Sequence, residues 1–432
     1  MLRSILRSRQ RAPARGSSSQ CSHVVIVGGG FGGLYAAKSL RDAPARVTLI
    51  DRRNHHVFQP LLYQVATASL SPADIAYPIR AILRRQSNAR VILANVDAID
   101  LDARAVSYAG KRMTYDYLIL APGAESSYFG HDEWAEHAPG LKTLDDALEM
   151  RRRVFFAFEA AELEADEERR RALLTFVVIG GGPTGVELAG ALGEIAHETL
   201  VRDFRSIDPS TSRICLIEAG ERILASFPPE LSRRAKRDLE RLGVEVRCGA
   251  QVTGVEPDRV LLSSGEIATE TILWAAGVSG SELLATLGAP LQRGGRVEVN
   301  PDLSLPAHPN VFVIGDAAYC LGPDGTPYPG LAPVAIQQGA TAARNVVRAL
   351  NGEPPAPFHY IDRGTMATIG KRRAVAVIRG RRLTGTIAWL AWVFVHILML
   401  IGFRNRVFVM SQWMWSYVTR QRAARLITEE RR

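Results

Sequence analysis

The chain has 432 residues, of which 47% are hydrophobic and 22% charged, and its mean hydropathy is +0.00. That length suffices for roughly two to four domains, and the composition excludes a disordered chain, a collagen, a small disulfide scaffold and a polytopic membrane protein. The net charge is +9, but residues 1–20 contribute +5 and residues 371–432 contribute +11, which leaves −7 for residues 21–370. An acidic body with two basic ends could bind nucleic acid or an anionic membrane.

The first motif lies near the start of the chain. A short β-branched run, Val24–Val27, precedes the glycines Gly28, Gly30 and Gly33, and a helical stretch follows them. The first glycine permits a tight turn, the second lets a pyrophosphate approach the backbone, and the third lets the helix pack closely on the strand. Asp51 ends the next strand, where a carboxylate can accept a hydrogen bond from a ribose hydroxyl. This combination predicts a dinucleotide-binding site.

The same pattern occurs a second time. Phe176–Ile179 precedes Gly180, Gly182 and Gly185, and Glu218 ends the strand that follows. The two sets of glycines are offset by 152 residues. A steady offset that extends over about 100 residues indicates an internal duplication.

The first copy is longer by about twelve residues, which we place within Asn54–Arg80. This insertion includes the apolar and aromatic stretch Phe58–Gln64. It lies near the strand ends, where ligands bind in doubly wound sheets. A ligand-contacting segment and a packing loop are equally compatible with the sequence.

A further buried strand, Val311–Ile314, follows the second copy and ends at Gly315 and Asp316. We interpret it as a return to the first domain, so that the second copy is an insertion. Asp316 could then hydrogen-bond a ribityl hydroxyl, which only a flavin nucleotide has, although a helix N-cap is the alternative. The predicted fold is therefore α/β, with two Rossmann-like domains, one inserted in the other, and with FAD in the first and NADH in the second. The expected domains are a disordered basic tail (1–20), the FAD-binding domain (21–145 and 295–370), the inserted NADH-binding domain (146–294) and a C-terminal helical membrane-anchoring domain (371–432).

Several polar side chains are candidates for the chemistry. Glu218 can accept from the adenosine ribose and repels a 2′-phosphate, so we expect NADH to be preferred to NADPH. Glu187 either lies near the nicotinamide or complements the dipole of its helix. Gln337 and Gln338 begin another helix and either line a site for a polar ring or lie at the surface. A long helix is expected over Leu144–Leu173.

Four cysteines, at positions 21, 215, 248 and 320, have neither CxxC nor CxxxxC spacing. We therefore expect no metal site and no redox-active dithiol, and interpret these residues as buried small hydrophobes plus one thiol in the N-terminal tail.

The tail has a membrane-type pattern. Residues 383–403 contain no Asp, Glu, Lys or Arg and would form a helix about 31 Å long. The stretch Val407–Val418 is amphipathic, with an expected apolar face of Phe408, Met410, Trp413, Trp415 and Tyr417. Apolar helices with interfacial Trp and flanking Arg favour a membrane lipid surface over nucleic acid as the partner, whether the first helix spans the membrane or lies in its plane. We interpret His396 as a packed or interfacial residue rather than a proton carrier.

These features together resemble the type II NADH dehydrogenases, single-subunit NADH:quinone oxidoreductases that do not pump protons. The more specific points of similarity are Phe58–Ala66, Gly364–Gly370 and the Trp-rich tail. The resemblance implies that NADH reduces FAD, that FAD reduces a membrane quinone, and that the protein is a homodimer. It also implies that Glu187 lies near the nicotinamide and flavin and that Gln337 lines the quinone site.

The sequence departs from the family at two points. Ala332-Pro333 stands where the family often has Ala-Gln, so the first of two quinone-site glutamines is missing, and Ala121-Pro122-Gly123 replaces a usual Ala-Thr-Gly. The predicted catalytic residues are Glu187, Gln337 and Gln338. The predicted cofactor-binding residues are Gly28, Gly30, Phe31, Gly32, Gly33, Asp51, Gln59, Pro60, Ala121, Gly123, Gly315, Asp316, Ala332, Gly180, Gly182, Pro183, Thr184, Gly185, Glu218, Ala276 and Gly277.

Two other functions remain open on the sequence: a sulfide:quinone oxidoreductase or related disulfide reductase, which needs a cysteine pair near the flavin, and a membrane-tethered NADH-binding regulator. The expected location is the cytoplasmic face of a bacterial inner membrane, as a peripheral (monotopic) protein. A mitochondrial transit peptide is the alternative interpretation of the Arg- and Ser-rich residues 1–20.

Overall fold

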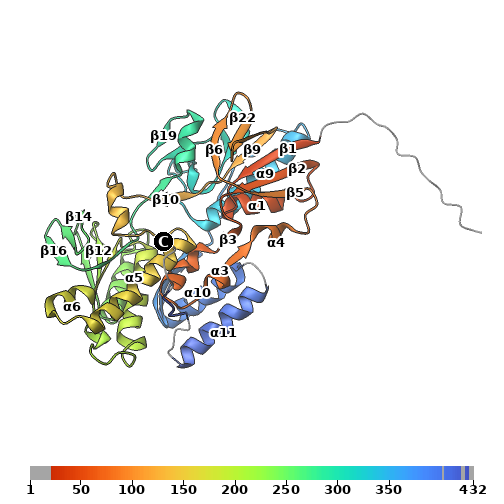
Figure 1. Cartoon of the computed structure of the whole chain (residues 1–432). Helices are drawn as coiled ribbons and strands as arrows, with labels where there is room; N and C mark the ends of the chain where they lie inside the picture. The colour runs from red at the N-terminus through yellow and green to blue at the C-terminus, as the bar shows by residue number, and fades with distance from the viewer. Residues whose placement is uncertain (1–20, 401–402, 420–423, 428–432) are drawn as a thin grey trace, which may run out of the picture.

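The computed structural model describes residues 21–400, 403–419 and 424–427; the predicted basic tail, 1–20, lies outside this part of the chain. Figure 1 shows two α/β lobes, one at the top and one at the lower left, with the helices α10 and α11 along the bottom.

The upper lobe is built on a six-stranded sheet. Its strands, in spatial order, are β21 (Ser304–Leu305), β22 (His308–Val313), β9 (Tyr117–Leu120), β1 (Ser22–Val27), β2 (Ala45–Asp51) and β5 (Ala89–Leu93). All neighbours pair in parallel except β21 and β22. The β-branched run Val24–Val27 forms the buried centre, as expected for a strand covered on both faces. Helix α1 (Phe31–Ser39) packs on this sheet and against α9 (Ala332–Leu350).

The lower lobe repeats the arrangement. Its four parallel strands, in spatial order, are β13 (Val244–Cys248), β12 (Arg213–Glu218), β11 (Thr175–Ile179) and β17 (Thr271–Trp274). This order corresponds to β5-β2-β1-β9 of the upper lobe, and helix α7 (Pro183–Glu194) takes the place of α1. Because β22 follows the second copy in sequence yet pairs with β9 of the first, the predicted duplication and insertion are confirmed.

Each copy also carries a three-stranded antiparallel sheet. The first consists of β6 (Val96–Asp100), β7 (Ala105–Tyr108) and β8 (Lys111–Thr114), and the second of β14 (Val252–Val255), β15 (Arg259–Leu262) and β16 (Gly265–Ala268). The short strands β10 (Ala124–Ser126) and β18 (Val278–Gly280) pair with each other and join the two lobes. The two lobes also contain α8 (Pro229–Glu240), β19 (Leu291–Gln292), β20 (Arg296–Glu298), β23 (Ala318–Tyr319), and the short helical turns Asp132–Glu136, Ile195–Thr199, Pro209–Thr211, Glu282–Leu287 and Gly315–Ala317.

The helix expected over Leu144–Leu173 is two helices, α5 (Leu144–Leu163) and α6 (Glu167–Leu173). The break has a local cause, because Asp166 caps α6 by accepting hydrogen bonds from the amides of Glu168 and Arg169. An N-cap residue takes an extended backbone conformation and so cannot continue the preceding helix.

The inserted segment of the first copy folds into short strands and helices, of which the helix Leu62–Ala66 is buried throughout. It comprises β3 (His55–Val57), a turn at Gln59–Leu61, α2 (Leu62–Ala66), α3 (Pro72–Ile75), β4 (Ala76–Pro78) and α4 (Ile79–Leu83). β3 pairs with β4, and α2 packs against α5. Every side chain of α2 is buried, so α2 packs in the core, whereas Gln59 and Pro60 of the same segment line the cavity described below.

The C-terminal part begins with the antiparallel strands β24 (Thr365–Gly370), β25 (Arg373–Ile378) and β26 (Arg381–Thr384), so this sheet crosses the domain boundary predicted at 370. β24 lies tightly on α7, since a Cβ atom on Gly190 would be 1.7 Å from the carbonyl oxygen of Ile369. Helices α10 (Gly385–Met399) and α11 (Phe403–Thr419) follow.

The helix expected over 383–403 is shorter than predicted. Residues 383 and 384 belong to β26, which pairs with β25, and α10 has 15 residues, or about 22 Å of helix. No helix within the described residues is both long enough and apolar enough to cross a membrane.

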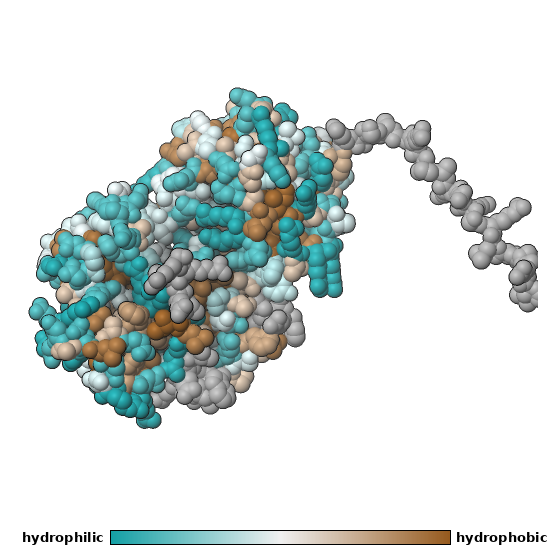
Figure 2. Space-filling view, in the orientation of Figure 1, coloured by the Kyte–Doolittle hydropathy of each residue, from teal (hydrophilic) through white to brown (hydrophobic). Residues whose placement is uncertain are grey.

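The two tail helices have an inner and an outer face. On α10, Trp392 is buried, whereas Ile387, Leu390 and Phe394 are more than half exposed. The apolar face predicted for α11 is divided in the structure. Phe408 and Met410 are exposed, as expected of a face turned to a membrane, whereas Trp413 of that face is buried together with Val409. Trp415 and Tyr417 of that predicted face have side chains outside the described set. Figure 2 shows hydrophobic residues at the surface where Figure 1 places α11.

Candidate functional site

The glycines of the first motif have the conformations that their predicted roles require. Gly28 has a φ of +97°, which only glycine adopts readily. A Cβ atom on Gly33 would lie 1.8 Å from the carbonyl oxygen of Gly28, so α1 approaches β1 as closely as a glycine allows. Gly30 differs, because a Cβ atom there would meet no protein atom within 4 Å. Its open face lies at the N-terminus of α1, where a phosphate is attracted.

The second motif repeats this geometry. Gly180 has a φ of +108°, and a Cβ atom on Gly185 would lie 1.8 Å from the carbonyl oxygen of Gly180. Gly182 faces open space, and Pro183 occupies the first turn of α7, where a missing amide proton costs nothing. The two motifs are therefore equivalent in backbone structure as well as in sequence.

The two acids at the strand ends are also equivalent. Asp51 accepts from the amide of Gly29 at 2.5 Å, and Glu218 accepts from the amide of Gly181 at 2.6 Å. Each acid also accepts from the amide two residues after itself. These bonds fix each carboxylate beside its glycine turn while leaving lone pairs for a ribose hydroxyl.

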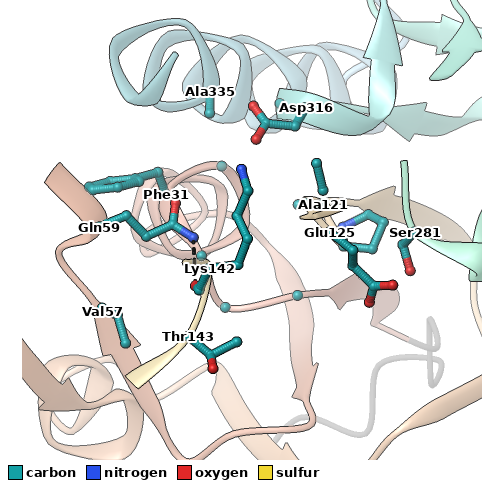
Figure 3. Close-up of a pocket in the computed structure, with 18 of the residues that line it drawn as sticks. Phe31, Val57, Gln59, Ala121, Glu125, Lys142, Thr143, Ser281, Asp316 and Ala335 are labelled. Carbon is teal, nitrogen blue, oxygen red and sulfur yellow. Dashed lines mark hydrogen bonds between the residues drawn. The ribbon is translucent and has the colours of Figure 1, made fainter. Parts of the chain in front are cut away.

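A cavity of about 600 Å³ opens beside the first motif. Its size is that of a small-molecule or cofactor site. It is lined by these predicted residues: Gly28, Gly30, Phe31, Gly32, Asp51, Gln59, Pro60, Ala121, Gly123, Thr184, Glu187, Gly315, Asp316 and Ala332. Figure 3 shows Phe31, Gln59, Ala121, Asp316 and Ala335 around this space. Thus the upper sheet, the inserted segment, the first turns of α9 and the start of α7 all contribute to one site.

Some lining residues were not found from the sequence. Lys142 and Thr143 come from the loop before α5, and His56 comes from β3. Nδ1 of His56 is 3.1 Å from the carbonyl oxygen of Gly29, and burial lowers the pKa of His56 to about 4, so the ring is neutral at pH 7. Thr143 could have been identified, since Thr143 and Asp146 have capping-box spacing and form that box in the structure. Lys142 has no comparable local signal.

A second, smaller cavity of about 90 Å³ lies between α7, β24 and the tail helices. Trp389 and Trp392 of α10 and Trp413 of α11 line it. Tyr63 and Glu187 line both this cavity and the larger one. These two side chains therefore form the boundary between the two cavities.

Glu187 lies in the second turn of α7, beyond the first turn where an acid would mainly complement the helix dipole. Burial raises the pKa of its carboxyl to about 8, and the amide of Thr368, 3.4 Å from Oε1, acts in the opposite direction. A carboxyl with this pKa holds its proton at neutral pH and can release it near pH 8.

The glutamines of α9 have structural partners. The side chain of Gln337 makes two hydrogen bonds with the backbone of Ile361, and Oε1 of the buried Gln338 accepts from the amide of Gly315 at 2.7 Å. Within the described residues, neither side chain lines the two cavities. The hydrogen bond from Gly315 to Gln338 fixes the turn that presents Asp316. Pro333, the departure from the family pattern, lies in the first turn of α9, where proline is well tolerated.

A series of aromatic contacts joins the inserted segment to the tail. Phe58 contacts Phe31 on one side and His396 on the other, with ring centroids 5.9 and 6.1 Å apart. His396 stacks on Trp392 at 4.2 Å, and burial lowers the pKa of His396 to about 4. The prediction that His396 is a packed residue agrees with this environment. Nε1 of Trp413 also donates to Oε1 of Gln64 at 2.8 Å, which ties α11 to α2.

The predicted residues of the second dinucleotide site lie at the strand ends of the lower lobe. Ala276 and Gly277 follow β17, and Gly277 has a φ of +70°. The ring of Phe129, from the segment that joins the lobes, lies against Gly277.

The comparisons with known proteins agree with this architecture. The sequence profile of the pyridine nucleotide-disulphide oxidoreductase family matches residues 22–339, and that of the NDH2 C-terminal domain matches residues 363–421. The type II NADH:quinone oxidoreductase NdhA of Mycobacterium tuberculosis is 46% identical over 426 residues, which cover 94% of this chain and 89% of NdhA. The enzyme Ndh of the same organism is 44% identical over 423 residues, which cover 94% and 90% of the two chains. The chain belongs to the type II NADH:quinone oxidoreductases.

As a type II NADH:quinone oxidoreductase, the protein is a respiratory enzyme that does not pump protons. Its fold is that of the NDH2 structure from Plasmodium falciparum in complex with NADH, with a TM-score of 0.85 at 19% identity over 95% of this chain and 100% of that one. A sulfide:quinone oxidoreductase from Aquifex aeolicus shares the fold with a TM-score of 0.71 at 22% identity over 89% and 92% of the two chains.

The cysteines argue against the chemistry of that second structure. None of the four lines either cavity in the described part of the chain. Cys215 and Cys320 are buried, and burial raises their pKa values to about 12 and about 11, which makes them poor nucleophiles at neutral pH. The sulfide-oxidising alternative therefore lacks its reactive cysteine pair.

Proposed function

We propose that the large cavity holds FAD, that NADH binds along the second glycine motif, and that quinone enters from the side of the tail helices. The observation that carries this proposal is the shared boundary: Glu187 and Tyr63 line both the large cavity and the small one beneath α10 and α11. A redox group bound in the large cavity could receive electrons from NADH there and pass them to a quinone in the small cavity.

The residues of the large cavity fit a flavin dinucleotide. Gly30 leaves room for a pyrophosphate at the N-terminus of α1, and Asp51 stands where a ribose hydroxyl would donate. Asp316 lines the far part of the cavity and is oriented by the turn that Gln338 holds. FAD would supply two-electron chemistry there, and the chain would supply position and electrostatics.

The second site fits NADH better than NADPH. The carboxylate of Glu218 is held beside the glycine turn, where the adenosine ribose binds in this fold. A ribose hydroxyl can donate to it, whereas a 2′-phosphate would be repelled.

The quinone site is proposed at the small cavity. Its tryptophans offer apolar faces to a ring, and Glu187 offers a proton. We assign Gln338 to the shape of the large cavity, because the backbone of Gly315 that it holds lines that cavity. Gln337 holds the backbone of Ile361, which lines neither cavity in the described part of the chain.

A stopped-flow experiment on the purified protein tests both half-reactions. NADH should bleach the flavin absorbance, and a short-chain quinone should restore it. NADPH should bleach it with a second-order rate constant about 100-fold lower, equivalent to ~2.7 kcal/mol of lost recognition. A flavin that NADH does not reduce would contradict the proposal, and equal rates with the two coenzymes would contradict the role of Glu218.

The outer face of the tail helices is proposed to bind the membrane surface, on the cytoplasmic side of a bacterial inner membrane, where NADH is available. Ile387, Leu390, Phe394 and Leu398 recur at helical spacing on α10 and are 49–68% exposed. Such an apolar stripe lies in the interface plane of a bilayer.

Replacing Phe394 by glutamate should weaken binding to phospholipid vesicles about tenfold, because burying a phenylalanine side chain contributes roughly 1.5–3 kcal/mol. Vesicle co-sedimentation measures this. Phe156→Glu on α5 is the matched control, since Phe156 is also more than half exposed but lies on another helix. Equal loss in both variants would show that α10 has no special part in membrane binding.

A further inference from the structure

Among the described residues, Lys142 is the one lysine that lines the large cavity, and its backbone is held by hydrogen bonds on both sides. Its amide donates to Oδ2 of Asp146 at 2.9 Å, and its carbonyl oxygen accepts from Nε2 of Gln59 at 3.4 Å. Asp146 belongs to the capping box of α5, and Gln59 belongs to the inserted segment. Two separate elements therefore fix the point from which the side chain extends.

The Lys142 side chain points into the cavity. Figure 3 shows it rising from its loop toward Asp316 and Ala335, with the Gln59 bond at its base. Among the described residues, the ammonium has no hydrogen-bond acceptor and no carboxylate within ion-pair distance. Three N–H donors thus face a site that is predicted to hold a ligand.

The charges around Lys142 narrow the choice of ligand. Burial lowers the pKa of the Lys142 ammonium, and the field of Asp316 opposes that shift. Asp316 is an acceptor only, so it suits a hydroxyl of the ligand. Lys142 is a donor only and a cation, so it suits a part of the same ligand that carries or gains negative charge.

We propose that the ammonium of Lys142 stabilises the negative charge that the flavin acquires on reduction, which rests on the proposed FAD site. A hydride brings two electrons and one proton to a neutral flavin, so the ring system gains one negative charge while NADH becomes NAD⁺. When the two electrons pass to quinone, the quinone takes up two protons, one from the flavin and one from the protein or solvent, and the charge disappears. Lys142 keeps its own proton throughout.

An interaction present only in the reduced state raises the flavin potential and favours reduction by NADH. Lys142→Met keeps the length of the side chain and removes its charge. We expect the reduced flavin to be bound about tenfold less tightly relative to the oxidised flavin, which lowers the two-electron midpoint potential by about 30 mV. Lys142→Arg should retain most of the wild-type potential because it keeps the charge.

Spectroelectrochemical titration of the purified, flavin-loaded protein measures the potential without turnover. Lys236→Met is the control for removing a lysine, since Lys236 lies on α8 beside Glu240 and outside the cavity. If Lys142→Met purifies without flavin, its affinity for FAD is measured under oxidising and under reducing conditions. The ratio of these two affinities then replaces the midpoint potential as the measured quantity. Selective weakening of the reduced form supports the inference, whereas equal weakening of both forms, or an unchanged potential, overturns it. A wild-type protein that binds no flavin would overturn the proposed function itself.

Discussion

Replacing Gly30 by alanine is expected to give a folded protein that has lost most of its flavin. Gly30 has an extended backbone, with φ −67° and ψ −161°, and a Cβ atom there would touch no protein atom within 4 Å. The added methyl group should therefore not disturb the fold but should occupy the space of the pyrophosphate. Flavin absorbance per mole of protein, with circular dichroism as the check on folding, measures the effect.

Gly182→Ala is the matched variant in the other copy, with φ −70° and equally open surroundings. It should keep its flavin but raise the KM for NADH at least tenfold, or ~1.4 kcal/mol, with artificial electron acceptors as well as with quinone. The two variants thus separate the two dinucleotide sites. Full flavin content in Gly30→Ala, or flavin loss in Gly182→Ala, would contradict the assignment of the sites.

Replacing Glu187 by glutamine is expected to slow quinone reduction about 100-fold, the usual contribution of a positioned proton donor. In the wild type the pKa of about 8 means that the rate of this half-reaction should fall as pH rises through 8, because the proton is then lost. Glutamine is neutral at every pH, so this break should vanish in the variant. Rates of flavin reoxidation by quinone between pH 6 and 10 measure both effects.

Glu194→Gln is the control, because Glu194 lines the same small cavity two turns further along α7. It should keep the pH break. If Glu187→Gln retained the break near pH 8, another group would be the proton donor.

The same pKa has a consequence for stability. Because the pKa of Glu187 is raised on folding from 4.5 to about 8, the folded state binds the extra proton between those values, and stability falls as pH rises through that range. Glu187→Gln should therefore raise the Tm relative to the wild type at pH 8 and change it little at pH 5.

Both glycine motifs were predictable because their requirements are local. Gly28 has a positive φ, and a Cβ atom on Gly33 would collide with the carbonyl oxygen of Gly28. Both requirements arise within about ten residues of sequence. The insertion of one domain in the other was predictable as well, because the strand before Asp316 follows the last strand of the second copy. In the structure it pairs with β9 of the first copy.

Lys142 and His56 could not be predicted, because each reaches the cavity through contacts with residues distant in sequence. Gln338 illustrates the opposite error: a polar side chain at the start of a helix was a candidate for a ligand contact, yet it bonds to the amide of Gly315. Sequence shows that a buried polar group needs a partner, but not whether the partner is a ligand or the backbone.

The tail shows the same limit. The absence of charge over 383–403 was visible, but the pairing of β26 with β25 takes the first residues away from the helix. Whether Phe408 and Val409 point outward or inward depends on how α11 packs against α2 and α10. The hydrophobicity of the residues does not determine that packing.

Helix α10 has one face at the molecular surface and the opposite face at the small cavity. Leu390 is 55% exposed, whereas Trp392, two residues away, lines the small cavity. A single helix is about 10 Å across. If lipid covers the outer face, a quinone ring needs to travel only that short distance to reach Glu187, and its isoprenoid chain can stay dissolved among the acyl chains. The enzyme then never has to transfer a whole lipid-soluble molecule into water, because only the reactive head leaves the bilayer.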